Sequence, residues 1–243
     1  IDDIERLTAS EIRQLFGLVK GVADFPTIMY LMAFDREVVT SALDSIQNVD
    51  GKSYLEKIVQ VSFDLPLPVP GAITDLLYHE LEPVVAEVPD SLWDNNLWAG
   101  LKWQIESFFQ TPRHVVRFLN AFSFTYGIVE NEVNVVDLIV LEILRVFQPD
   151  VYETIRQNPE FFVEDNSSKW RWRATDPNDP DAPLRAFHQH WLAQLEQTTE
   201  KRRIEEILRK LFPLFERALY TNAFYVQDRD KSCRIGDPNH FRT

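Results

Sequence analysis

The sequence predicts an α/β fold for its first part and an all-helical fold for the remainder, so that helix dominates overall. Residues 27–34 and 59–65 are apolar and nearly uncharged, as strands buried on both faces are, and amphipathic segments alternate with them. That order is typical of a parallel sheet. From Ala72 onward, apolar residues recur every three or four positions instead, and this change follows three prolines within residues 66–70.

The chain begins with Ile1, followed by the adjacent carboxylates of Asp2 and Asp3. Two neighbouring acids after a strand can divide two roles in nucleotide hydrolysis: one holds a magnesium ion and the other polarises the attacking water. We therefore expect this pair to lie at the end of a strand. The alternative is an acidic, solvated N-terminal segment without such a role.

The first helix is expected over residues 8–25. Thr8 and Ser10 are possible N-caps, and a proline at position 26 ends the helix because the residue before proline prefers extended geometry. The apolar residues between them have the spacing of one helical face: Ile12, Leu15, Phe16, Val19 and Val22. This amphipathic helix leads into the first predicted strand.

Polar residues follow the first predicted strand at its carboxyl end. In open α/β sheets, ligands bind at the carboxyl ends of the strands, so Asp35 and Arg36 are candidate site residues. Asp35 can also serve as the N-cap of a second helix, expected over residues 36–45, and the two roles are compatible. Lys57 precedes the second predicted strand in a short helical or turn segment, where an ordinary surface role is the alternative.

The second region, residues 71–159, is expected to be all-helical. Its candidate helices are Ala72–Glu87, Leu97–Phe109, Pro112–Tyr126, Val135–Val146 and Val151–Gln157. Thr111 can cap the helix that begins at Pro112, because proline at the first helical position needs no hydrogen-bond donor. Arg113 and Arg117 lie four residues apart and share one face of that helix, where two cations can meet an anion. The alternative is that they pair with the abundant carboxylates of the protein itself.

The third region, residues 160–183, is expected to be a loop or boundary, because apolar periodicity fails there. Its basic aromatic cluster, Lys169–Arg173, could stack on single-stranded nucleic acid or contact a membrane, but contact with the acidic body of the protein is the preferred interpretation. The last region, residues 184–243, is expected to be helical, with a break at Pro213. His188 and His190 within it lack further ligands at the spacing of a zinc site.

Composition excludes several classes of protein. The formal net charge is −13, so binding to bulk nucleic acid is not expected, and no sequence-specific nucleic-acid partner is predicted. No apolar run approaches the ~20 residues that a membrane-spanning helix needs, and no signal peptide is recognisable. The single Cys233 excludes an internal disulfide and a zinc site built from cysteines. These features indicate a folded protein of a reducing, cytoplasmic compartment.

Five motifs then occur in a fixed order: IDDIERL, TIMYLMAFDRE, YLEKIVQVSFDLP, TPRHVVRFLNAF and VNVVDLIVLEILRVFQPDVY. Together they resemble the KAP family of P-loop NTPases, relatives of the AAA+ and STAND ATPases, over residues 1 to about 160. The resemblance implies that residues 1–70 are the C-terminal part of a P-loop NTPase sheet and residues 71–159 a helical lid, followed by a helical extension. Members include bacterial phage-exclusion proteins and membrane-associated scaffolds.

The resemblance also implies roles for the acidic residues. Asp2 corresponds to the Walker B acid that holds Mg²⁺, and Asp3 to the acid that activates water. Asp35 and Arg36 fall where related ATPases place a phosphate sensor, at the end of the strand beside Walker B.

The resemblance also implies roles for three basic residues. Arg113 corresponds to the lid arginine that senses the γ-phosphate, and Arg117 is a secondary candidate. Lys57 lies where AAA+ proteins place an arginine finger that reaches a neighbouring subunit. An ammonium cannot make the planar two-pronged contact of a guanidinium, so this departure weakens the assignment of Lys57.

The sequence lacks a GxxxxGK[ST] motif, which supplies the phosphate-binding loop of these enzymes. We therefore expect ATP and Mg²⁺ to be cofactors of a full-length parent ATPase, while this chain alone is inactive. The parent would couple hydrolysis to a conformational switch with a protein partner or with itself. The alternative is a non-catalytic helical scaffold. The resemblance adds the cytoplasmic face of a membrane as a second location.

Overall fold

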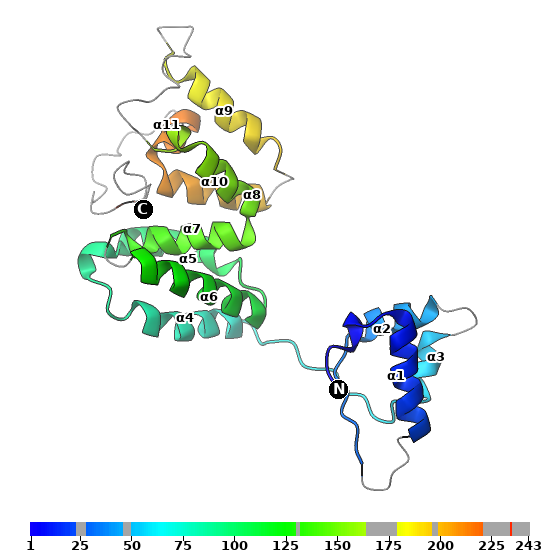
Figure 1. The fold of residues 1–243 in the computed structure, drawn as a ribbon. Coiled ribbons are helices and arrows are strands. Elements are labelled where there is room, and N and C mark those ends of the chain that lie inside the picture. The colour runs from blue at the N-terminus through cyan, green and yellow to red at the C-terminus, as the bar shows by residue number, and fades with distance from the viewer. Residues whose placement is uncertain are drawn as a thin grey trace. The chain divides into compact units, whose positions relative to one another are not determined.

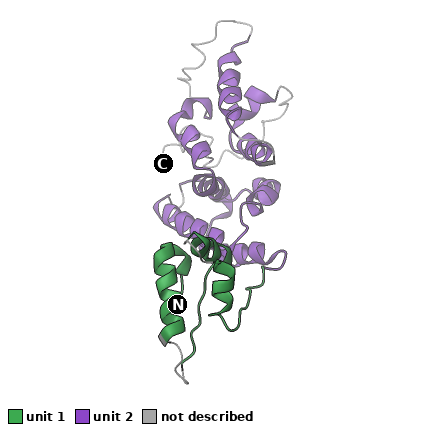
Figure 2. Cartoon of the chain, turned by 90° about the vertical axis from the view of Figure 1, so that its right-hand side faces the viewer, with its two compact units in different colours: residues 1–67 green, residues 68–243 purple. Residues whose placement is uncertain are grey.

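The computed structural model describes residues 1–22, 28–45, 50–129, 132–163, 179–195, 199–220 and the single residue Arg234. The chain divides into two compact units, Ile1–Leu67 and Pro68–Thr243 (Figure 2). Each unit has a hydrophobic core of its own. The predicted basic aromatic cluster around Trp170 falls outside the described residues, as does Cys233.

The prediction of a parallel sheet in the first unit is wrong, because the described residues contain no β-strand. The first unit consists instead of a 3-10 turn and three helices joined by extended segments (Figure 1). The turn is η1 (Ile4–Arg6), and the helices are α1 (Ala9–Val22), α2 (Arg36–Asp44) and α3 (Gly51–Glu56).

The described residues of both predicted strands have no regular secondary structure, and many of their apolar side chains face solvent. Met29 is 93% exposed, and Phe63 and Leu65 are 86% and 92% exposed. The N-terminal amino group of Ile1 donates to the carbonyl of Leu31 at 2.7 Å, and the amide of Ala33 donates back to the carbonyl of Ile1 at 2.9 Å. These two bonds pair a single residue, which is too little for a ladder. The low charge of these two segments therefore led to a wrong prediction of buried strands.

The helices of the first unit are capped and packed by the residues that their sequence provides. The core contains Ile4, Ile12, Phe16, Val39, Leu43 and Leu55. At the start of α1, the amide of Thr8 donates to Glu11 Oε2 at 2.8 Å and the amide of Glu11 donates to Thr8 Oγ1 at 3.4 Å, a capping box. Helix α3 begins at Gly51, where a Cβ atom would lie 2.5 Å from the backbone oxygen of Thr40. Glycine therefore permits the close approach of α2 and α3.

The second unit is all-helical where it is described, as predicted. Its α-helices are α4 (Ala72–Val85), α5 (Asn95–Glu106), α6 (Pro112–Val129), α7 (Val135–Phe147), α8 (Pro149–Gln157), α9 (Ala182–Leu192), α10 (Thr199–Leu211) and α11 (Pro213–Leu219). Two 3-10 turns lie between them, η2 (Asp90–Leu92) and η3 (Pro159–Phe161). The predicted break at Pro213 is present, because this proline is the first residue of α11 and follows the end of α10.

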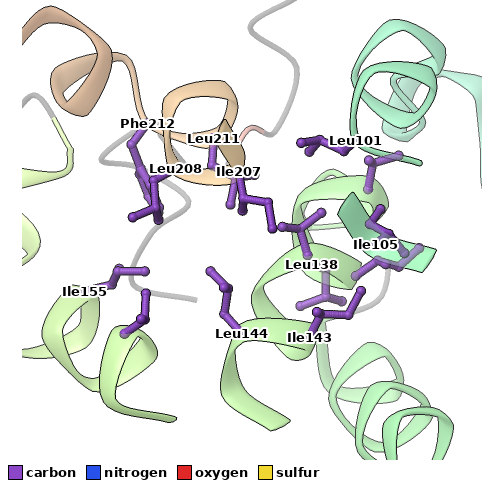
Figure 3. Packing of buried hydrophobic residues seen from close by; sticks show 14 of the residues in the cluster. Leu101, Ile105, Leu138, Ile143, Leu144, Ile155, Ile207, Leu208, Leu211 and Phe212 are labelled. Atoms are coloured by element: carbon purple, nitrogen blue, oxygen red, sulfur yellow. The ribbon is translucent and has the colours of Figure 1, made fainter. Parts of the chain in front are cut away.

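Helix α7 lies at the centre of the second core. It packs against α5, α6 and α8, and nearly all of its residues are buried. Figure 3 shows Leu138 of α7 beside Ile207 of α10, and Leu144 and Leu208 of these two helices belong to the same core. The position of α7 therefore depends on helices that come both before and after it in the sequence.

Candidate functional site

The predicted acid pair lies at the surface of the first unit, on an unusual turn. Asp3 has a left-handed backbone with φ of 57°, the single such non-glycine residue among those described. It precedes η1, and its Oδ1 forms an ion pair with Nη2 of Arg6 at 3.2 Å. Asp2 Oδ1 accepts the amide of Asp3 at 2.9 Å. A left-handed residue costs on the order of 1 kcal/mol, and aspartate is among the residues that tolerate it.

The acid pair and Asp35 belong to neighbouring pieces of the first unit. Ile1 is hydrogen-bonded to residues 31 and 33, just before Asp35, and η1 packs against α2. Asp35 is the N-cap of α2: its Oδ1 accepts the amides of Glu37 at 2.9 Å and Val38 at 3.1 Å. The capping role considered from the sequence is therefore present, whereas its phosphate-sensing role stays a prediction.

Arg36 lines an open hollow of about 400 Å³ on the first unit, together with Glu37, Thr40, Ser41 and Lys52. Lys57 lies at the C-terminal end of α3, where its backbone amide donates to the carbonyl of Tyr54 at 3.3 Å. Its side chain is exposed, and no ion pair involves it within the described residues. A finger role for Lys57 stays a prediction.

Arg113 and Arg117 both lie on α6 in the second unit, but their side chains have different surroundings. Arg117 Nη2 donates to the carbonyl of Val146 at 2.9 Å, near the C-terminal end of α7, where free carbonyls and the helix dipole favour a cation. Arg113 is exposed in the first turn of α6 and makes no ion pair or side-chain hydrogen bond in the described parts of the chain. Arg113 is thus the freer of the two to meet an anion.

The described residues contain no group of three or more His, Cys, Asp or Glu side chains that could hold a metal ion. Mg²⁺ commonly takes one or two protein carboxylates and completes its shell with water and substrate phosphates. Asp2 fits such a site because its carboxylate is exposed and its Oδ1 is oriented by the amide of Asp3. The acid pair therefore suits Mg²⁺ only in combination with a bound phosphate.

The two histidines considered as metal ligands have other surroundings. His188 is fully buried: its Nε2–H donates to the carbonyl of Phe161 at 3.0 Å, and the indole N–H of Trp191 donates to its Nδ1 at 3.1 Å. Burial lowers the pKa of His188 to about 4, so it is neutral at physiological pH. His190 is exposed and meets Gln194. His188 is a core residue that has a partner at each ring nitrogen.

Comparison with known proteins places these residues in a family. A family model described as the KAP family P-loop domain matches residues 1–129, more than half of the chain. A phage T7 exclusion protein of Escherichia coli strain K12 is 29% identical over 157 residues, which are 63% of this chain and 21% of that protein. The chain thus spans about a fifth of this relative. No solved structure gives a significant match. None of the described helices is long and apolar enough to cross a membrane.

Proposed function

Because the chain belongs to the KAP family of P-loop NTPases, we propose that it supplies the metal, water and γ-phosphate contacts of an ATP-driven switch in a full-length protein. The observation that carries this proposal is the acid pair Asp2-Asp3, held on a left-handed turn beside the segment that ends at Asp35. Strain at a polar surface turn is a feature of functional sites. A merely solvated acidic terminus would not need it.

Each acid has one task in this proposal. Asp2 would hold Mg²⁺, which would neutralise part of the charge of the nucleotide phosphates. Asp3 accepts a hydrogen bond from the attacking water and orients it toward phosphorus. The ion pair with Arg6 at 3.2 Å helps to hold the Asp3 carboxylate in place. Asp35, fixed as a helix cap, orients the neighbouring Arg36 toward the phosphates.

Arg113 is the proposed γ-phosphate contact of the helical region. Its lack of a partner within the described residues supports this role, since a guanidinium already bound to protein would have to exchange partners. Arg117 is bound to Val146, and we assign it to the packing of α6 on α7. Arg113 would contact the γ-phosphate while ATP is bound and lose that contact after hydrolysis.

The chain alone lacks the motif that cradles the phosphates, so it is expected to bind nucleotide weakly and not to hydrolyse it. By analogy with the phage T7 exclusion protein, we place the full-length protein in defence against phage, acting with a protein partner or by self-association. A non-catalytic interaction module is the second candidate. The exposed side chains of Val116, Phe124 and Ile128 on α6 favour it, because exposed apolar groups on one helix are typical of docking surfaces.

The test is ATP turnover by the full-length protein and by its Asp3→Asn variant. The substitution keeps size but removes the charge that orients water, so kcat should fall by about 10²-fold or more with little change in KM. Asp75→Asn is the matched control, since Asp75 is an exposed aspartate of α4. Unchanged turnover in Asp3→Asn would remove the catalytic assignment. No turnover in the wild-type full-length protein would favour the interaction module.

A further inference from the structure

Arg234 joins two helices of the second unit that are far from it in the sequence. Its Nε donates to Asp137 Oδ2 at 2.7 Å, across 97 positions, and its Nη1 donates to Asp94 Oδ2 at 3.0 Å, across 140 positions. Arg234 is 8% exposed and Asp137 is completely buried. This guanidinium therefore holds two carboxylates with two of its nitrogens, away from solvent.

Both carboxylates belong to helix N-termini. Asp94 is the N-cap of α5, and its Oδ1 accepts the amide of Leu97 at 2.9 Å. Asp137 lies in the first turn of α7, whose N-cap Asn134 accepts the amides of Val136 and Asp137. Each helix N-terminus carries about half a positive charge. Two such ends and one guanidinium balance the charge of the two carboxylates, which explains how the group can be buried.

We propose that Arg234 is a strap: its side chain binds the N-terminal ends of α5 and α7 together and fixes the packing of these two helices. This pair of carboxylates is suited to a guanidinium because a planar fork can reach two carboxylates on different helices at once. An ammonium is a compact point charge and cannot present two nitrogens in this geometry. Without Arg234, two carboxylates would remain close together in a partly buried site.

The first experiment is thermal unfolding of the full chain with Arg234→Ala. The melting temperature should fall by on the order of 10 °C, because breaking a buried ion pair leaves uncompensated charge. Arg202→Ala is the matched control, an exposed arginine of α10 in the same unit, and its melting temperature should stay close to that of the wild type. Millimolar methylguanidinium should raise the melting temperature of Arg234→Ala but not of the control, and methylammonium should not replace it.

A second set of variants covers the case in which Arg234→Ala does not fold. Arg234→Lys keeps the charge and should still be clearly less stable than the wild type. Arg234→Met combined with Asp94→Asn and Asp137→Asn removes the stranded charges while asparagine keeps the cap of α5, and it should be more stable than Arg234→Met alone.

A residue-by-residue measurement distinguishes a local role of Arg234 at α5 and α7 from a general loss of stability. In Arg234→Lys, amide hydrogen exchange should rise at the first turns of α5 and α7 more than in α9 and α11. Equal rises throughout the second unit would overturn the proposal. So would rescue by methylammonium as strong as by methylguanidinium, or wild-type stability of Arg234→Lys.

Discussion

Protonation of buried His188 should make the protein sensitive to mild acid. Only the neutral ring can keep both hydrogen bonds, because Nδ1 must be unprotonated to accept the indole N–H of Trp191 while Nε2–H donates to the carbonyl of Phe161. Burial lowers the pKa of His188 from 6.5 to about 4 in the folded state. Below pH 6.5, His188 binds a proton in the unfolded chain, whereas in the folded chain it stays neutral until the pH approaches 4. Stability from this residue is therefore complete above pH 6.5 and is lost as the pH falls toward 4.

The size of the effect follows from the pKa difference. A shift of this size corresponds to about 3 kcal/mol in full, of which roughly 2 kcal/mol is lost by pH 5. The assay is urea unfolding at pH 7.5 and pH 5 for the wild type and for His188→Gln, whose amide can donate and accept but does not titrate. His190→Gln is the control, because His190 is exposed on the same helix.

The expected result is a loss of stability on acidification that is about 2 kcal/mol larger in the wild type and in His190→Gln than in His188→Gln. Other groups also titrate in this range, but they are common to all three proteins and cancel in the comparison. The same pH dependence in the wild type and in His188→Gln would refute the assignment of the acid sensitivity to this residue.

Two further pairs of substitutions test the site and the packing. Arg117→Ala should lower the free energy of unfolding by about 1 kcal/mol in urea melts, because the Val146 carbonyl loses its donor. Arg113→Ala should leave that free energy unchanged and lower ATP turnover of the full-length protein by about 10²-fold; the reverse pattern would contradict the proposed division of roles. Gly51→Ala should destabilise the first unit by about 1–3 kcal/mol, because its Cβ would meet a backbone oxygen. Gly17→Ala, where nothing lies nearby, should stabilise α1 by about 0.5–1 kcal/mol in the same melts.

The helices could be predicted because their signals are local. The capping box of Thr8 and Glu11, the cap at Asp35 and the start of α6 at Pro112 depend on contacts within one turn. The periodicity of the second unit could be read in the same way, since a helix satisfies its own backbone groups. Its break at Pro213 required only the chemistry of proline.

The predicted strands failed for the opposite reason. A strand is defined by a partner elsewhere in the chain, and an apolar run does not encode that partner. Residues 28–34 have the composition of a buried strand, but Met29 and Leu31 face solvent. The signal was sufficient to exclude a helix there and to place Asp35 just beyond the segment, but it could not decide burial.

The sequence suggests the residues of the candidate site one by one, but it does not show how they are arranged. The adjacent acids were visible in the sequence, but the left-handed turn at Asp3 depends on η1. Arg234 was not singled out at all, because its carboxylate partners lie 97 and 140 positions away and nothing local distinguishes it from other arginines.

Arg113 and Arg117 show why spacing alone gives an incomplete account of function. Four residues apart, they share one face of α6, and the sequence treats them as equivalent cations. The end of α7 lies beside Arg117 and offers it a carbonyl, so one arginine is used to join two helices and the other stays available. Because α7 is also held at its N-terminal end by Arg234, two arginines fix the helix against which α6 packs. The packing of α6, the helix that carries Arg113, therefore depends on both of these contacts.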